Sequence, residues 1–257
     1  MNQDYIKPDE WSIIEEEFDA GRVKSSESLF SIGNGAMGQR ANFEEQYSGP
    51  SFQGSYIGGV YYPDKTKVGW WKNGYPEYFA KVLNAPNWIG INVFVNEEAL
   101  DLNTCEKVTN FRRELNMKEG FLARSFEATL PNGVEVEVKA MRFLSIVDDE
   151  LGAIKFEVTP LNLDATVRFD PYLDGSITNT DANWEERFWE TLEVTSENER
   201  GFLVSKTLKT EFHVGTFMQS EVFLNSKKEG QSPEVKTDED RLSFSYSVKT
   251  NKAETAS

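Results

Sequence analysis

Two stretches of the sequence place aromatic rings beside amide and cationic side chains, a mixture that suits sugar binding. The first runs from Trp70 to Trp88 and the second from Asn179 to Trp189. A pyranose lays its apolar C–H face on an aromatic ring, while its hydroxyls pair with amides and charged groups. The side chains predicted to bind substrate or contact another domain are Trp70, Trp71, Lys72, Asn73, Tyr75, Trp88, Trp184 and Trp189.

The same aromatic residues have a commoner use that involves no ligand. Trp and Tyr often pack a loop onto a β-sandwich or fill a protein–protein interface, because they bury a large apolar area. Both interpretations stay open for the two stretches.

Four carboxylates near the first aromatic stretch are candidates for acid catalysis, namely Glu44, Glu45, Asp64 and Glu77. Glycoside cleavage needs a positioned carboxylic acid. Nothing in the spacing of these residues selects a pair, and a solvated or hydrogen-bonded carboxylate is the ordinary case. We therefore assign no catalytic residue.

The run from Gly33 to Gly38 has the letters of a dinucleotide-binding fingerprint. That fingerprint works only when a helix follows the glycine turn within a βαβ unit. The residues after Gly38 include Asn42 and Phe43 and show no helical stripe. The run therefore predicts a glycine turn between two strands.

Composition excludes several other classes of protein. The 27 Lys+Arg residues against 43 Asp+Glu give a formal charge of -16, which repels nucleic acid and anionic membranes. Cys105 and His213 are the single cysteine and histidine, too few for a structural zinc site, and we expect no metal. The first 19 residues lack a signal-peptide pattern, so we expect a cytoplasmic protein.

Period-two alternation dominates the chain and predicts an all-β fold. In Val134–Ala140 apolar residues alternate with charged ones, and Leu122–Leu130 alternates in the same way. Pro131, Asn132 and Gly133 between them predict a tight hairpin turn. Further strands are predicted around Ile154–Val158, Val167–Phe169, Phe202–Val204, Phe212–Val214 and Leu242–Val248.

The alternation changes phase at Ala140 and Met141, which predicts a bulge that swaps the faces of a long strand. Residues 219–240 are polar but mark no second domain. We expect residues 1–257 to form a single antiparallel domain.

The run from Glu27 to Glu45 resembles the opening signature of family 65 glycoside hydrolases and phosphorylases. The runs Gly54–Tyr62 and Trp70–Ile91 continue the resemblance in the family's order, and Asn179–Trp189 is similar to a segment of the maltose phosphorylase branch. The similarity spans most of the chain.

The resemblance implies a large antiparallel β-sandwich, a supersandwich of the galactose mutarotase-like kind, placed before a helical linker and an (α/α)6 barrel. In the family's phosphorylases a glutamic acid of the barrel protonates the leaving oxygen while phosphate attacks the anomeric carbon with inversion. The products include β-glucose 1-phosphate, and no metal or organic cofactor is needed.

Because this chain ends at Ser257, the resemblance implies a non-catalytic N-terminal domain. Its implied partners are its own catalytic barrel, an α-glucoside disaccharide, inorganic phosphate and a second subunit in a homodimer. Maltose is the preferred substrate, with kojibiose, trehalose and nigerose as alternatives. A hydrolase of trehalose or another α-glucoside, or a free-standing carbohydrate-binding or assembly module, also fits the sequence.

Overall fold

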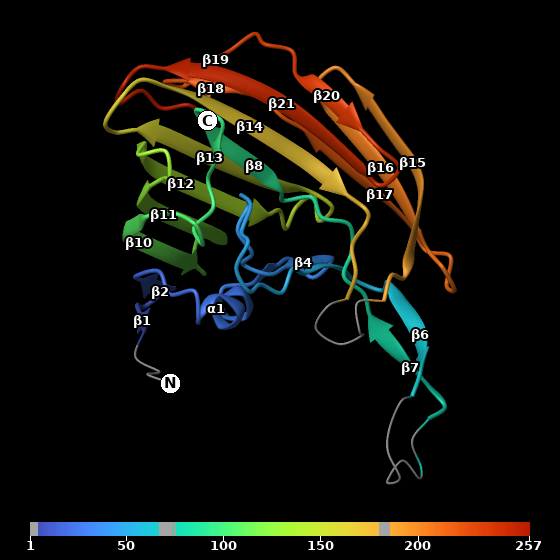
Figure 1. The fold of residues 1–257 in the computed structure, drawn as a ribbon. Helices are drawn as coiled ribbons and strands as arrows, with labels where there is room; N and C mark the ends of the chain where they lie inside the picture. The colour runs from blue at the N-terminus through green and yellow to red at the C-terminus, as the bar shows by residue number, and fades with distance from the viewer. Residues whose placement is uncertain (1–4, 67–73, 75, 180–185) are drawn as a thin grey trace.

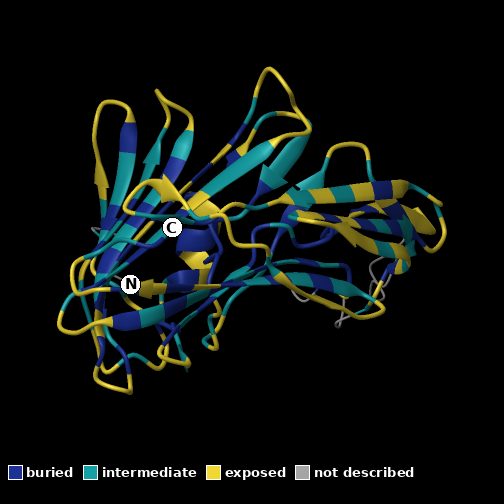
Figure 2. Ribbon diagram, turned by 90° about the horizontal axis from the view of Figure 1, so that it is seen from above, coloured by how far each residue is buried: buried dark blue, intermediate teal, exposed yellow. Residues whose placement is uncertain are grey.

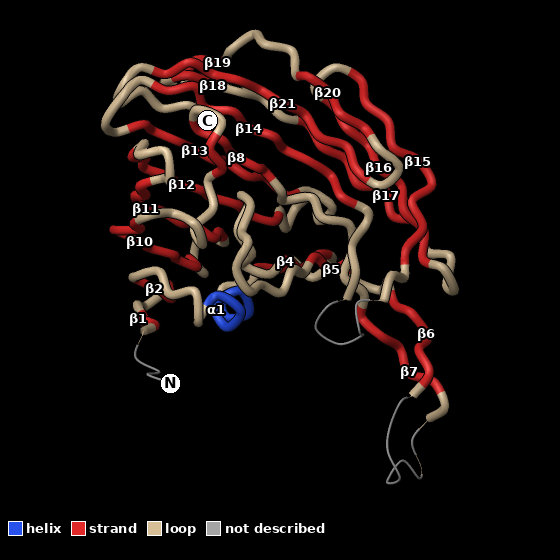
Figure 3. The backbone as a smooth tube through the Cα atoms, viewed as in Figure 1, coloured by secondary structure: helices blue, strands red, loops and turns tan. Residues whose placement is uncertain are grey.

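The computed structural model describes residues 5–66, 74, 76–179 and 186–257, which form antiparallel sheets and one short helix. Figure 1 shows the described strands layered into a curved sandwich, and Figure 3 shows how little of the described chain is helical. The largest sheet has six strands in the spatial order β1 (Ile6–Pro8), β2 (Ser12–Glu16), β10 (Lys107–Asn116), β11 (Phe121–Thr129), β12 (Glu135–Leu144) and β13 (Gly152–Pro160).

Two further sheets complete the layered body. The five-stranded sheet has the spatial order β20 (Glu234–Thr237), β21 (Arg241–Thr250), β14 (Ala165–Asp174), β8 (Ile91–Val95) and β9 (Glu98–Ala99). One of the two three-stranded sheets among the described residues consists of β15 (Trp189–Glu197), β16 (Arg200–Thr207) and β17 (His213–Gln219). Every strand pairing among the described residues is antiparallel.

The remaining elements are short. They are the helix α1 (Val23–Leu29) and the strands β3 (Ile32–Gly33), β4 (Met37–Gln39), β5 (Ser55–Ile57), β6 (Tyr61–Lys65), β7 (Tyr78–Val82), β18 (Phe223–Leu224) and β19 (Lys227–Lys228). Strands β6 and β7 form a hairpin that projects from the sandwich (Figure 1).

The main core lies between the six-stranded and the five-stranded sheets. Phe126 and Val138 from the first sheet pack in one buried cluster with Phe169 and Phe244 from the second. Alternate side chains of each strand enter this core, as a half-buried strand requires. The predicted all-β sandwich is confirmed.

The predicted hairpin is also confirmed, as β11 and β12. Gly133 has a φ of 78°, a conformation that glycine adopts without steric cost. The side chain of Asn132 accepts the N–H of Val134 over 3.1 Å and donates to the carbonyl of Val95 over 2.9 Å. The turn is therefore tied both to itself and to the facing sheet.

The predicted bulge at Ala140 and Met141 is wrong. Strand β12 keeps one register with β11 from Glu135 to Phe143, and Met141 and Phe143 are exposed. Arg142 takes the inward position between them and is 0% exposed. The strand does not switch faces, because this arginine finds charged and carbonyl partners inside the fold.

The glycine turn is confirmed between β3 and β4. Asn34 stabilises it, since its side-chain oxygen accepts the N–H groups of Ala36 over 3.0 Å and Met37 over 2.7 Å. Gly35 has a φ of 96°. The described residues after Gly38 contain no helix, so the support that a bound pyrophosphate needs is missing from them.

Candidate functional site

The two aromatic stretches of the sequence meet at one place. Trp189 begins β15 and is 2% exposed, and its indole N–H donates to the carbonyl of Asn84 over 2.8 Å. A buried indole N–H needs such a partner. The contact joins the segment that follows β7 to the start of β15. We call the buried residues Asn84, Asn179 and Trp189 the asparagine–tryptophan junction.

At this junction the side-chain amides of Asn84 and Asn179 bond backbone groups that would otherwise need a partner on a neighbouring strand. The side-chain oxygen of Asn179 accepts the N–H of Asn84 over 2.9 Å, and its amide nitrogen donates to the carbonyl of Val82 over 3.0 Å. The side-chain oxygen of Asn84 accepts the N–H of Ser55 over 2.8 Å. Buried backbone groups that lack a ladder partner are thereby satisfied.

The inner face of the β6–β7 hairpin carries a charged pair against aromatic rings. Lys81 forms an ion pair with Asp64, and both side chains are largely buried. The Lys81 ammonium lies 5.2 Å from the centre of the Phe188 ring, which packs at 4.5 Å from Tyr62. Asp64 is thus held in a cation–aromatic cluster. Glu77 is exposed, in keeping with an ordinary solvated carboxylate.

The outer face of the same hairpin is largely apolar and exposed, with Lys65 at one end and the Tyr61 ring 5.4 Å from the ring of Phe212. Tyr61 pairs with Val82 and Lys65 pairs with Tyr78, so these residues point to the same side. Tyr61, Tyr78 and Val82 are 44%, 51% and 63% exposed, and we call these three residues the hairpin face. In Figure 2, which looks down on the molecule from above, exposed residues gather mainly in the loops that join the strands. Clustered exposed apolar side chains typically mark an interaction surface.

The structure separates Trp88 from the junction. Its ring packs instead against the small core that contains Leu122 and Leu144, beside Gly152. The candidates that lie outside the described residues are Trp70, Trp71, Lys72, Asn73, Tyr75 and Trp184. The roles of all eight candidates in substrate binding or domain contact stay predictions.

Glu44 and Glu45 belong to a cluster of charges inside the sandwich. Arg124 donates to Glu44 over 2.9 Å and also pairs with Glu45, while Arg142 donates to Glu44 over 2.7 Å. Burial opposes the charge on Glu44, but the guanidinium groups of Arg142 and Arg124 outweigh it and hold the pKa of Glu44 below its ordinary value. A carboxylate of this kind does not serve as a proton donor near neutral pH.

Arg142 also holds the loop that follows β4. Its guanidinium donates to the carbonyl of Asn42 over 2.9 Å and to the carbonyl of Arg40 over 2.7 Å. Sequence reasoning missed this residue, although it continues the inward phase of Val138 and Ala140. The signal was therefore present in the alternation but looked like a change of phase.

A second buried pair joins β2 to β10. A carboxylate oxygen of Glu15 lies 3.4 Å from a guanidinium nitrogen of Arg113, and the hydroxyl of Ser26 donates to the Glu15 carboxylate over 2.8 Å. Burial raises the pKa of Glu15 above its ordinary value and lowers that of Arg113 to about 10. We call Glu15, Glu44, Glu45, Arg113, Arg124 and Arg142 the buried charge cluster.

The remaining reactive residue types form no centre in the part of the chain that the structure describes. No group of three or more His, Cys, Asp and Glu side chains there has a metal-binding arrangement. Burial raises the pKa of Cys105 to about 11, which keeps its thiol protonated. His213 is exposed on β17. Within the same residues no helix has the length and apolarity to cross a membrane.

Residues 13–257 match the family described as glycosyl hydrolase family 65, N-terminal domain. The chain belongs to this family. The loop from Arg40 to Glu45 ends the signature that suggested family 65, and its polar groups serve the buried charge cluster. The described end of this signature therefore makes polar contacts inside the sandwich.

Several similar proteins are named as phosphorylases. The maltose phosphorylase of Bacillus subtilis (strain 168) is 42% identical over 97% of this chain and 33% of its own length. The α,α-trehalose phosphorylase of Thermoanaerobacter brockii is 31% identical over 86% of this chain and 30% of its own length. The family 65 chain thus spans about a third of the length of these relatives.

A solved structure shares the fold of the whole family 65 chain. It is a human-microbiome protein named as a candidate kojibiose phosphorylase, with a TM-score of 0.81 and 24% identity over 98% of this chain and 32% of its own.

Proposed function

We propose that this chain is the non-catalytic N-terminal domain of a longer enzyme that cleaves an α-linked disaccharide by inverting phosphorolysis, with maltose as the preferred substrate. The substrate rests on one observation, the 42% identity with a maltose phosphorylase over 97% of this chain. The relatives named as trehalose and kojibiose phosphorylases share less of the sequence.

The geometry supports the non-catalytic part of the proposal. Glu44 and Glu45 are ion-paired inside the sandwich, and Asp64 is paired with Lys81. The proton donor and the phosphate-binding residues then belong to a catalytic barrel that follows in sequence. There phosphate takes the place of the attacking water of an inverting hydrolase and yields β-glucose 1-phosphate. This chemistry needs no metal or organic cofactor.

The hairpin face supports a docking role. Tyr61, Tyr78 and Val82 form an apolar surface on a projecting element, which suits burial against another protein surface. In the proposed enzyme the partner surface belongs to the catalytic barrel of the same polypeptide. The asparagine–tryptophan junction fixes the base of the hairpin, so the hairpin meets its partner in a set orientation. A homodimer is expected in addition.

The test is an assay of the full-length protein with maltose, trehalose and kojibiose, each with and without inorganic phosphate. The expected result is phosphate-dependent cleavage that is fastest with maltose and releases β-glucose 1-phosphate, with the anomer identified by NMR. Phosphate-independent release of glucose would instead show a hydrolase. Sugar binding without turnover would show a carbohydrate-binding module.

A further inference from the structure

The C-terminal residues of the chain lie between two strands and pair with both through isolated bridges. Ala256 exchanges both backbone hydrogen bonds with Val158 of β13, over 2.8 and 3.0 Å. Ser257 exchanges both of its own with Phe223 of β18, over 2.7 and 3.0 Å. Residues 255–257 therefore join β13, the edge strand of the six-stranded sheet, to the β18–β19 hairpin.

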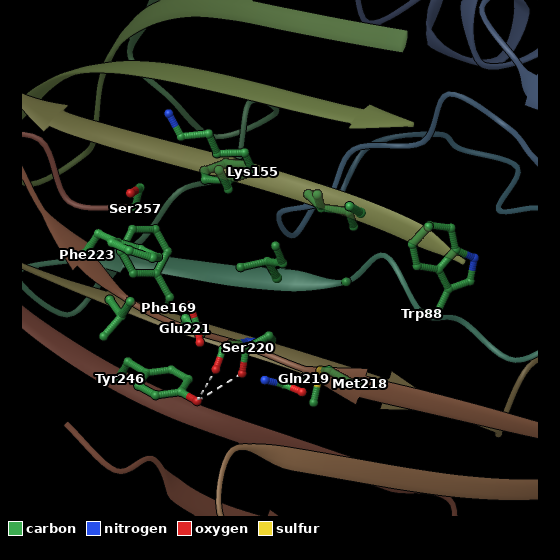
Figure 4. A pocket seen from close by; sticks show the side chains of 18 of the residues that line it. Trp88, Lys155, Phe169, Met218, Gln219, Ser220, Glu221, Phe223, Tyr246 and Ser257 are labelled. Carbon is green, nitrogen blue, oxygen red and sulfur yellow. Dashed lines mark hydrogen bonds between the residues drawn. The ribbon is translucent and has the colours of Figure 1, made fainter. Parts of the chain in front are cut away.

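A groove of about 790 Å³ opens directly ahead of Ser257. Figure 4 shows it running from Ser257 and Phe223 at one end to Trp88 at the other, along β13. One wall is the first half of β13, and the other is the segment from Phe217 to Phe223. The ring of Phe169 lines it from the facing sheet.

The outer edge of β13, on the side away from β12, is unpaired along this groove in the part of the chain that the structure describes. Val158 directs its N–H and carbonyl outward to Ala256, and in an antiparallel strand every second residue directs these groups to the same side. Phe156 and Ile154 therefore also direct theirs outward. Among the residues that the structure describes, no hydrogen-bond partner faces them.

We propose that the groove is the seat of the residues that follow Ser257 in the full-length protein, which continue the strand along β13. This inference rests on the proposed function, in which the polypeptide extends into a catalytic barrel. Carrying the register of Ala256 and Val158 forward to Gly152 takes about five residues. The strand supplies the missing partners of Ile154 and Phe156 and closes the edge of the sheet.

The register also fixes which of those residues are apolar. Ala256 pairs with Val158 and points into the core, where it is fully buried. Side chains alternate along a strand, so the first and third residues after Ser257 point inward as well. They contact the interior beside Phe156 and Phe169, so we expect them to be apolar. The second and fourth residues point away from the core.

The closing experiment compares two extended forms of the 257-residue chain. One carries Val-Thr-Val-Thr after Ser257, and the other carries Thr-Val-Thr-Val, so composition and length are matched and only the phase differs. Backbone amide exchange is measured by NMR at Ile154, Phe156 and Val158. The amide of Val158 is already bonded in the unextended chain and is the internal control.

The first extension is expected to slow exchange at Ile154 and Phe156 by about tenfold, the scale of one added backbone hydrogen bond, and the second extension is not. Equal exchange in the two extended chains would overturn the proposal. Slow exchange in the unextended chain that depends on its concentration would also overturn it, since a second copy would then occupy the groove.

The experiment is independent of activity. If the extensions behave as expected but the full-length protein shows no phosphorolysis, the strand assignment stands and the proposed enzyme function fails. If phosphorolysis is found but both extensions leave the two amides exchanging freely, the strand assignment fails and the proposed enzyme function stands.

Discussion

The buried charge cluster and the β6–β7 hairpin use side chains in opposite ways. In the cluster, arginines and glutamates lie inside the sandwich, where Arg124 and Arg142 neutralise Glu44. On the hairpin, Tyr61 and Val82 are 44% and 63% exposed. Buried charges are tolerated only when they are paired, and exposed apolar groups gain by being covered. This contrast supports the proposal of a non-catalytic domain that docks on a protein partner.

The largest expected effect breaks the charge cluster. Replacing Arg142→Met leaves Glu44 with one guanidinium partner fewer and leaves the carbonyls of Asn42 and Arg40 without their donor. We expect a loss of about 3–5 kcal/mol in the free energy of unfolding, measured with urea at pH 7. Arg112→Met is the control, because Arg112 makes exposed ion pairs worth up to about 1 kcal/mol. Equal losses would show that the cluster is not a stabilising centre.

A smaller effect is expected at the asparagine–tryptophan junction. Replacing Trp189→Phe removes the indole N–H and leaves the buried carbonyl of Asn84 without that donor. We expect a loss of about 2 kcal/mol in the free energy of unfolding, from the unpaired carbonyl and the smaller ring. The exposed Phe217 gives the control, and Phe217→Leu should change stability by less than about 0.5 kcal/mol. If the Trp189→Phe variant has the same free energy of unfolding as the wild type, the junction hydrogen bond does not stabilise the fold.

The smallest effect concerns pH. The hydrogen bond from Arg187, together with one from Thr191, holds the pKa of Asp240 below its ordinary value of 3.8. A lowered folded-state pKa stabilises the fold above 3.8, and this stability is lost as pH falls below that value. The difference in melting temperature between the wild type and Asp240→Asn should therefore be small near pH 7 and shrink toward pH 3. A difference that grows on acidification would contradict this assignment.

Hairpins and strands that depend on short-range alternation and turn residues were predicted correctly from the sequence. The β11–β12 hairpin follows from alternation around Gly133, and the strand β21 follows from alternation alone. The helix α1 was missed because it has seven residues, no side-chain hydrogen bond at its N-cap residue Arg22 and no acidic residue in its first turn. Such a helix is stabilised by packing and leaves little trace in sequence.

Long-range pairing explains the remaining differences. Arg142 and Glu44 are 98 positions apart, so nothing near Arg142 shows that its charge is compensated. Trp189 and Asn84 are 105 positions apart, and their hydrogen bond joins two stretches that the sequence shows only as separate aromatic clusters. Sequence reasoning therefore found the residue types of the candidate site but not their arrangement.

The most direct test of the docking role is hydroxyl-radical footprinting of the hairpin face, read by mass spectrometry. Tyr61 and Tyr78 are exposed in the 257-residue chain, as is Trp11 beside β2, which is the control. Both tyrosines are expected to be oxidised readily in this chain and several-fold more slowly in the full-length protein, while the rate at Trp11 stays the same. Equal oxidation of the two tyrosines in both proteins would contradict the proposal that the hairpin face is covered by the rest of the full-length protein.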